Sequence, residues 1–270
     1  MGKTLELAKN QGCIKSRKIN NILKPNIEKN KQIFSHFLVI DFEATCWDRK
    51  PGPPNEVIEF PAVLMNVKGE VIKTFHHYVQ PTEEPNLSEF CRNLTGISQS
   101  QVENAPPLGS VLMLFNTFLK SLNVKFNEVD LNNCAVVTWT DWDMKICLGY
   151  ECKRKNLLFP TCLKSWIDLK LIYKKFYNRN PQGLNGALQE MGLKFQGRQH
   201  SGLCDAKNTG KLVHKMIQDG CILGLTKCLD DVKLDPKLSF DLELIKVKYS
   251  RCPKFFHVGN SSLVLNLFSQ

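Results

Sequence analysis

The sequence has no long apolar run near its start that could serve as a signal peptide or membrane anchor. Residues 1–31 instead carry eight lysines and arginines against two glutamates. This composition predicts a basic N-terminal arm, residues 1–35, that either contacts phosphates or is an inert tail. We therefore expect no association with membranes.

The sequence also lacks the cysteine spacing of zinc sites and disulfide frameworks. Its 11 cysteines are odd in number, and the closest pairs, Cys147/Cys152 and Cys221/Cys228, do not have C-x₂-C spacing. Several cysteines lie in apolar surroundings, where a reduced thiol packs as a small hydrophobic group. We expect an intracellular protein, in the cytoplasm or the nucleus, with free thiols.

Negative charge is in the minority, because 26 acidic residues stand against 36 lysines and arginines, for a formal net charge of +10. Such an excess favours a polyanionic partner such as nucleic acid. Nothing in the sequence indicates a protein partner. With 270 residues, 43% of them hydrophobic, the chain is long enough for one substantial α/β domain.

Hydrophobic periodicity predicts three strands at the start of this domain, followed by strands and helices in alternation. The first strand begins at His36, and the next two, 57–66 and 71–79, form a meander around a turn at 68–70. Further along we expect a strand at 134–139 and helices at 87–94, 107–119, 163–176, 184–191 and 206–219. The predicted fold is α/β, with a mixed central sheet flanked by helices over residues 36–225, and with 226–270 as an unassigned extension.

The run from His36 to Thr45 is the most informative part of the chain, because an apolar strand ends there in two carboxylates. Side chains at i and i+2 of a strand point to the same face, so Asp41 and Glu43 should converge. Two close anions are unfavourable unless a cation lies between them, and Mg²⁺ and Mn²⁺ prefer oxygen ligands. An ordinary exposed strand end is the alternative explanation for this pair taken alone.

Three further polar residues follow in an order that would complete such a site. Asp143 follows the strand 134–139, at the edge where open α/β sheets place their ligands, although Asp141 competes with it and could equally be a helix N-cap. His200 lies in a glycine-flanked loop, and Asp205 lies at the start of the next helix. Each has an ordinary alternative role, but their joint appearance indicates a metal-dependent active site.

On these residues the chain resembles the DEDDh exonucleases of the RNase H-like fold, and among them the Eri-type 3′-to-5′ exonucleases. The resemblance spans roughly residues 36–222. It is carried by the stretches Asp41–Trp47, Glu56–Pro61, Leu87–Cys91, Leu94–Ile97, Trp142–Met144 and His200–Gly202.

The resemblance implies a metal-dependent exonuclease that works from a free 3′-hydroxyl and releases 5′-mononucleotides. It favours Asp143 over Asp141, and it makes His200 the general base and, with Glu43, a catalytic residue. The implied ligands of two Mg²⁺ ions, for which Mn²⁺ would substitute, are Asp41, Glu43, Asp143 and Asp205. This chemistry is reasonable, because paired dications stabilise the attacking and leaving oxygens and histidine can accept a proton near neutral pH.

A terminal nucleotide needs a stacking surface and contacts to its sugar, and six residues are predicted to supply them. They are Phe42, Ala44, Leu94, Thr95, Trp142 and His200. A core position is an equal alternative for Trp142. The basic runs Lys153–Lys155 and Lys174–Lys175 are candidates to follow the RNA backbone, with a solvated helix face as the usual alternative.

The sequence departs from the family pattern at Cys204, where relatives often carry an aspartate that is not one of the four ligands. It also has no room for an N-terminal SAP module in residues 1–35 and no zinc-finger pattern in its C-terminal extension. The predicted function is a 3′-to-5′ exonuclease with RNA as the expected substrate. A DNA-directed exonuclease and a catalytically silent nucleic-acid-binding protein are the alternatives, and the complete acidic set argues against the silent protein.

Overall fold

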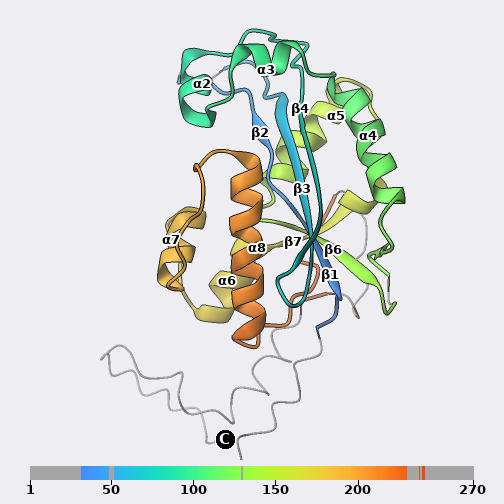
Figure 1. Ribbon diagram of the computed structural model, residues 1–270, viewed down its shortest axis with the longest axis vertical. Helices are drawn as coiled ribbons and strands as arrows, with labels where there is room; N and C mark the ends of the chain where they lie inside the picture. The colour runs from blue at the N-terminus through green and yellow to red at the C-terminus, as the bar shows by residue number, and fades with distance from the viewer. Residues whose placement is uncertain (1–31, 49–51, 129, 230–236, 238, 241–270) are drawn as a thin grey trace, which may run out of the picture. The chain divides into compact units, whose positions relative to one another are not determined.

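The computed structural model describes residues 32–48, 52–128, 130–229, 237 and 239–240 (Figure 1). Nearly all of the predicted basic arm and most of the C-terminal extension therefore lie outside the described residues. Those that are described belong to one compact unit of the chain.

An eight-stranded mixed sheet forms the centre of this unit. Its main path runs β2-β3-β1-β6-β7-β8, while β4 pairs with β3 and β5 pairs with β6. The strands are β1 (His36–Ile40), β2 (Glu43–Ala44), β3 (Val57–Asn66), β4 (Val71–Tyr78), β5 (Lys125–Phe126), β6 (Asn133–Thr138), β7 (Ser165–Asp168) and β8 (Lys227–Cys228).

Strand β1 lies in the middle of the sheet, antiparallel to β3 and parallel to β6. Leu38, for example, is opposite Leu64 on one side and Val136 on the other. An interior strand that is covered on both faces must be apolar throughout, which explains why its sequence is a continuous hydrophobic run. The end of β1 is therefore held firmly, and the site begins there.

Helices cover both faces of the sheet (Figure 1). They are α2 (Glu89–Thr95), α3 (Gln99–Glu103), α4 (Leu108–Lys120), the π-helix η1 (Trp142–Leu148), α5 (Gly149–Arg154), the 3₁₀-helix η2 (Thr161–Lys164), α6 (Leu169–Tyr177), α7 (Gly183–Glu190) and α8 (Gly202–Gln218). One core cluster joins the sheet to α4, η1 and α5, and a second joins it to α6, α7 and α8. Leu38 and Ile40 of β1 belong to the first cluster, and Phe37 and Val39 belong to the second, as the alternation of a strand requires.

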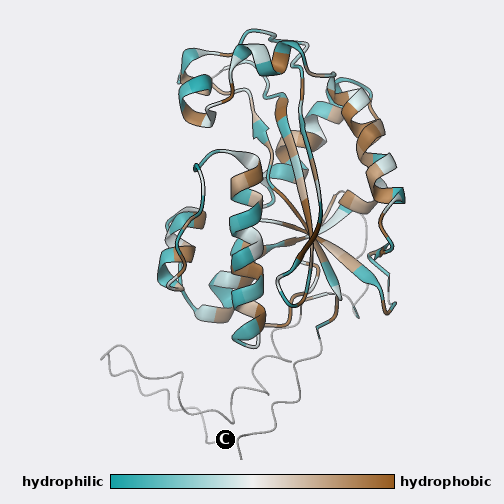
Figure 2. Cartoon of the chain, viewed as in Figure 1, coloured by the Kyte–Doolittle hydropathy of each residue, from teal (hydrophilic) through white to brown (hydrophobic). Residues whose placement is uncertain are grey.

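Hydropathy follows this layering, because the central strands β1 and β3 are largely hydrophobic while covering helices such as α8 have a hydrophilic side (Figure 2). The exposed sides of α6 and α8, for instance, carry most of the polar residues of those helices. Amphipathic helices of this kind stabilise the fold by burying one stripe against the sheet.

The predicted meander of three strands is confirmed, and β3 has the predicted bounds. The predicted helix at 163–176 is wrong in its first part, because Ser165–Asp168 forms strand β7 before α6 begins. Trp166 and Ile167 are both fully buried, on opposite faces of the sheet, and such a two-sided run has no alternation by which a strand could be recognised. Asp168 then caps α6, since its side chain accepts a hydrogen bond from the backbone N–H of Leu171 at 2.8 Å.

Packing continues beyond the predicted domain bounds of 36 and 225. Phe34 is fully buried in the second core cluster, and the side-chain amide of Gln32 donates a hydrogen bond to the carbonyl of Cys221 at 2.7 Å. At the other end, Leu229 packs against the first cluster after β8 has paired with β7. Residues 1–31 and 241–270, which make up most of the two predicted flanks, lie outside the described part.

Nine of the cysteines fall within the described ranges, and all nine are free thiols. None of the helices found there is long and apolar enough to cross a bilayer.

Candidate active site

Two of the predicted carboxylates lie at one end of the central strand. Asp41 follows the last residue of β1, and Glu43 begins β2 two residues later. Both side chains are partly buried. Strand β2 runs antiparallel to β3, and the pairing places Glu43 opposite Glu59. Three acidic residues therefore lie near the same end of the sheet.

Asp143 reaches this end from the first turn of the π-helix η1. Its side chain is buried, and Oδ1 accepts a hydrogen bond from the backbone N–H of Phe42 at 2.9 Å. Because Phe42 lies between Asp41 and Glu43, this bond holds the third carboxylate beside the first two. The wide turns of a π-helix are often found at functional sites, and η1 begins at this point of the chain.

Asp205 arrives from the opposite face of the sheet, in the first turn of α8. The start of α8 lies very close to the end of β1, since a Cβ at Gly202 would be only 2.5 Å from the carbonyl oxygen of Asp41. Only glycine allows this approach without displacing the helix. The four predicted carboxylates thus come from the end of β1, from β2, from η1 and from α8, and the last two elements are far from the first two in the sequence.

The electrostatics of the four groups are those of an uncompensated acidic cluster. Burial, followed by the charges of Asp143, Asp205 and Glu43, raises the pKa of Asp41 well above its ordinary value. Burial and the neighbouring carboxylates raise the pKa of Glu43 to about 9. Burial also raises the pKa of Asp143 and of Asp205 to about 7, although backbone hydrogen bonds to each carboxylate act in the opposite direction.

This donor set fits divalent cations. All of its donors are hard carboxylate oxygens, and none of the four acids forms an ion pair with a lysine or arginine in the described part of the chain. As the side chains are now oriented, no three histidine, cysteine, aspartate or glutamate residues within the described ranges are arranged to hold an ion. The backbone brings the four acids to one end of the sheet, and their side chains would have to rotate into coordinating positions.

His200 lies beside the cluster in sequence but is exposed to solvent. Its backbone adopts the left-handed conformation, with φ of 60°, which is uncommon for a residue with a side chain. The residue lies in the connection between α7 and α8, three residues after Gly197, which also has a positive φ of 86°. This loop therefore presents the imidazole outwards, immediately before the helix that carries Asp205.

Glu59 is a residue of the site to which the sequence analysis gave no role. Its carboxylate accepts hydrogen bonds from the backbone N–H groups of Gly202 at 2.9 Å and Leu203 at 3.2 Å, and it lies 2.8 Å from Nε2 of His76. It is almost completely buried, and it fixes the start of α8 to the sheet. The available signal was an ionisable residue inside an apolar strand, since a buried carboxylate needs hydrogen-bond partners.

The structure separates the six predicted nucleotide-binding residues into two groups. Two of them expose side-chain surface to solvent, namely Trp142, which is 36% exposed, and Leu94, which is half-buried. Phe42 and Ala44 do not, because both side chains belong to the core and the Phe42 ring packs edge-to-face on Phe60 at 4.6 Å. Both residues are buried as a whole, and the backbone N–H of Phe42 is already bound by Asp143.

The hydroxyl of Thr95 is already occupied within the fold. It donates a hydrogen bond to the carbonyl of Cys91 at 2.8 Å and accepts one from the backbone N–H of Ile97 at 3.1 Å. The side chain is buried at the end of α2. Its observed contacts stabilise the turn that follows Leu94.

The basic run Lys153–Lys155 is not a free phosphate-binding strip. Lys155 is half-buried and paired with the buried Glu56 and Glu151, with Nζ 2.6 Å from the Glu151 carboxylate. Arg154 pairs with the exposed Glu83 at 3.1 Å. Of the three, only Lys153 is exposed without an ion pair to a described residue. Buried carboxylates require a charged partner, so the charge of Lys155 serves the fold.

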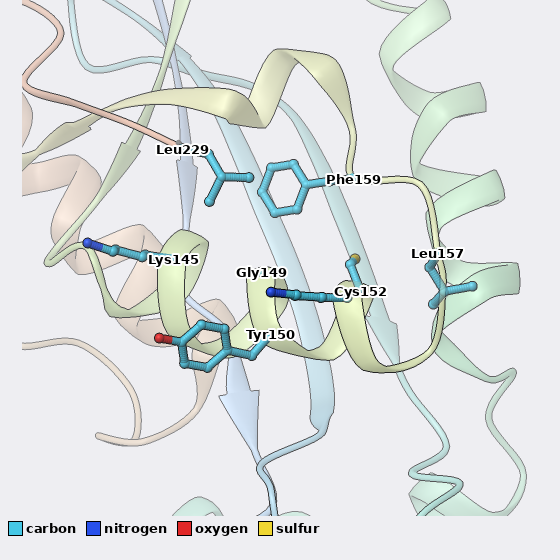
Figure 3. Close-up of a pocket in the computed structure, with 8 residues that line it drawn as sticks. Lys145, Gly149, Tyr150, Cys152, Leu157, Phe159 and Leu229 are labelled. Carbon is cyan, nitrogen blue, oxygen red and sulfur yellow. The ribbon is translucent and has the colours of Figure 1, made fainter. Parts of the chain in front are cut away.

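A cavity of about 420 Å³ lies along η1 and α5 and is separate from the acidic cluster. Figure 3 shows Leu229 and Phe159 on one side of it and the helix that carries Tyr150 and Cys152 on the other. None of the predicted metal-binding or nucleotide-binding residues lines this cavity.

Comparison with known proteins identifies relatives of the whole domain. The family model described as "Exonuclease" matches residues 38–213. The chain is 46% identical over 254 residues to "ERI1 exoribonuclease 2" of Xenopus laevis. This alignment covers 88% of this chain and 36% of the relative. It is 44% identical over 211 residues to "3'-5' exonuclease Snipper" of Drosophila melanogaster, covering 73% of this chain and 75% of Snipper. The chain spans only 35–42% of the length of the four ERI1 exoribonuclease 2 proteins that it matches.

Solved structures agree with these relatives and confirm the predicted RNase H-like fold. The nuclease domain of 3'hExo, described as a DEDDh family member bound to rAMP, has a TM-score of 0.67 at 35% identity, covering 73% of this chain and 98% of that one. A full-length 3'-exonuclease has a TM-score of 0.70 at 33% identity, covering 77% of this chain and 70% of that one. The chain therefore belongs to the exonuclease family, within its DEDDh group.

Proposed function

We propose that this domain is a Mg²⁺-dependent 3′-to-5′ exonuclease that removes 5′-mononucleotides from the 3′ end of RNA. The observation that carries the proposal is the convergence of four carboxylates from four separate elements on one end of the sheet. Divalent-metal dependence is the rule for the DEDDh fold. Mg²⁺, with Mn²⁺ as a substitute, is our proposal for the ion.

The proposed ligands are Asp41, Glu43, Asp143 and Asp205, whose raised pKa values reflect burial first and the charges of neighbouring carboxylates second. When bound, two such ions stabilise the charge that develops on the attacking and leaving oxygens.

The proposed general base is His200. An imidazole can accept the proton of the attacking water at neutral pH, and its place in an exposed loop gives it access to solvent and substrate. Trp142 offers a partly exposed ring for stacking on a base, and Leu94 offers an apolar surface at the end of α2.

RNA is the proposed substrate for two reasons. The chain is basic, with a formal net charge of +10, and its curated relatives include proteins named exoribonucleases. One structural relative, 31% identical with a TM-score of 0.67, is described as a 3'-exonuclease that recognises a histone mRNA stem-loop at its 3' end. Free thiols at all nine described cysteines support an intracellular location, in the cytoplasm or the nucleus.

The direct test uses the purified chain with RNA and DNA oligonucleotides of the same sequence, labelled at the 5′ end. With Mg²⁺ we expect an RNA ladder that shortens one nucleotide at a time, and no reaction with EDTA. The Asp41→Asn variant should be inactive. Asp130→Asn, which alters a surface acid paired with Lys125, is the matched control and should behave as the unaltered protein.

Three outcomes would contradict the proposal. Internal fragments from a circular substrate would indicate an endonuclease. A ladder from DNA but not from RNA would indicate the DNA-directed alternative. RNA binding without cleavage under any metal would indicate the silent binding protein.

A further inference from the structure

Arg198 lies two residues before His200 and connects the loop of the proposed base to the far side of the site. Its Nη2 donates a hydrogen bond to the carbonyl of Asn93 at 2.7 Å and a longer one to the carbonyl of Leu94 at 3.4 Å. These carbonyls lie at the end of α2, where helix carbonyls have no partner within the helix and where positive charge is favourable.

The contact is shaped to receive a guanidinium group. Gly96, the C-cap of α2, has a positive φ of 74°, and a Cβ at this position would collide with Nη1 and Cζ of Arg198. The guanidinium therefore lies directly against the glycine. A side chain at position 96 would be unfavourable both for the backbone conformation and for this close approach.

Helix α2 is itself attached to the strand that carries Glu43. The hydroxyl of Ser88, its N-cap, donates a hydrogen bond to the carbonyl of Cys46 at 2.6 Å. The thiol of Cys91 contacts the carbonyl of Ala44 at 3.7 Å. A group that is bound to the end of α2 is thus fixed relative to β2 and its carboxylate.

The loop that carries His200 is held from two sides. Its C-terminal end is fixed at Gly202 by the carboxylate of Glu59. Its N-terminal part is fixed by Arg198, and between these two points lie only three residues. Apart from the two bonds of Arg198, no hydrogen bond is found between the loop 197–201 and α2 in the described structure.

We propose that Arg198 is a positioning residue, which couples the nucleotide-contacting end of α2 to the loop of His200 so that the base is held over the bound 3′ terminus. This inference rests on the proposed function, because it assumes that Leu94 contacts the terminal nucleotide and that His200 is the base. Arg198 itself need not touch the substrate.

Kinetics of the Arg198→Ala variant test this role. We expect kcat to fall by about 10- to 100-fold, because a displaced catalytic group loses that much, while KM changes less than about threefold. Calorimetric Mn²⁺ affinity should be unchanged. Arg179→Met is the control, since Arg179 is exposed and contacts only Glu190, at 4.0 Å, among the described carboxylates.

Chemical rescue separates positioning from a general loss of stability. Methylguanidinium added to Arg198→Ala should restore part of kcat, because the space against Gly96 is open. Gly96→Ala should show the same loss of kcat with Arg198 still present, and added methylguanidinium should not rescue it. A kcat within about twofold of the unaltered protein for Arg198→Ala, or a loss that appears only in KM, would overturn the proposal.

A measurement without substrate distinguishes failure of this inference from failure of the proposed function. Amide hydrogen exchange in residues 197–201 should be at least about tenfold faster in Arg198→Ala than in the unaltered protein or in Arg179→Met. Unchanged exchange would exclude the coupling even if the protein is an exonuclease. Faster exchange in a chain with no nuclease activity would retain the coupling and reject the proposed function.

Discussion

The carboxylate of Asp143 accepts a hydrogen bond from the backbone N–H of Phe42 at 2.9 Å, across 101 residues of sequence. The donor is main chain, so the bond does not depend on which side chain occupies position 42. It holds an acid from η1 between the two acids that follow β1. The side chain of Asp143 therefore has a structural role besides its proposed role as a ligand.

These two roles can be separated by substitution. Asp143→Asn keeps an oxygen that can accept from Phe42 and should retain the fold while abolishing hydrolysis. Asp143→Ala leaves a buried N–H without a partner, so we expect a further loss of about 1–3 kcal/mol in the free energy of unfolding. Urea denaturation of both variants in EDTA, together with a nuclease assay, measures the difference. Equal stability of the two variants would show that the hydrogen bond contributes nothing.

The acidic cluster should make the metal-free protein less stable as the pH rises. Glu43 has an ordinary pKa of 4.5, and its pKa is raised to about 9 in the folded state, so between these values the folded state binds more protons than the unfolded state. The free energy of unfolding must then decrease with increasing pH in that range. Asp143 and Asp205, with pKa values raised to about 7, add to the decrease below that pH.

Thermal melts in EDTA at a series of pH values from about 5 to 9 would measure this slope. Glu43→Gln should flatten it, and Asp41→Ala should raise Tm above that of the unaltered protein at pH 8, because one repelling charge is removed. Saturating Mn²⁺ should reverse the slope, since the ion binds the deprotonated acids of the folded state. A Tm that rises with pH in EDTA would contradict the raised pKa values.

Replacing His200 by alanine should lower kcat by about 10²- to 10⁴-fold, the usual cost of losing a general base. Its side chain is exposed, so the melting temperature should change little. Mn²⁺ affinity measured by calorimetry should also be retained, because His200 is not among the proposed ligands. Loss of Mn²⁺ binding in this variant would move the histidine into the metal shell.

Lys155 and Lys153 lie two residues apart, but we expect their replacement to have very different effects on the free energy of unfolding. Lys155→Met would leave Glu56 and Glu151 buried without their cation, and we expect the free energy of unfolding to fall by about 3–5 kcal/mol. Lys153→Met, at an exposed position, should change it by less than about 0.5 kcal/mol. Denaturation by urea compares the two variants directly.

A phosphate on the 3′ end of an RNA oligonucleotide should strongly inhibit digestion. It adds charge and bulk where the proposed site for the terminal nucleotide is expected to receive a hydroxyl. The measurement compares initial rates on oligonucleotides with 3′-hydroxyl and 3′-phosphate ends. Treatment with a phosphatase should restore the rate on the second substrate, and equal rates before treatment would disprove a requirement for a free 3′ end.

The four acids could be proposed from the sequence because strand ends and helix starts can be recognised locally, and because the family resemblance favoured Asp143 over Asp141. It could not predict how Glu59 acts, because its three partners, Gly202, Leu203 and His76, come from β4 and α8, and only the folded chain brings them together. The same limit applies to Lys153–Lys155, for which phosphate contact and a solvated helix face were the alternatives. The ion pairs of Arg154 and Lys155 could not be predicted, because their partners Glu83 and Glu56 lie far away in the sequence.

The elements of the fold were predictable where periodicity was strong, as in β3 and α4. Prediction failed for Phe42, which was expected beside the nucleotide. Its position next to Glu43 suggested the site, but alternation along the chain sends its ring to the opposite side, into the core. In a strand that ends at a metal site, alternate residues serve the chemistry and the packing.

The distribution of the four acids along the chain also affects how the protein is made. Synthesis proceeds from the N-terminus, so a nascent chain that has released β1, β2 and η1 already carries Asp41, Glu43 and Asp143. It still lacks α8 and therefore Asp205, as well as the loop of His200 and the helix start that Glu59 binds. On the proposed assignment of the ligands and the base, the nascent chain therefore completes its active site only when α8, the last helix found in the described part of the domain, has left the ribosome.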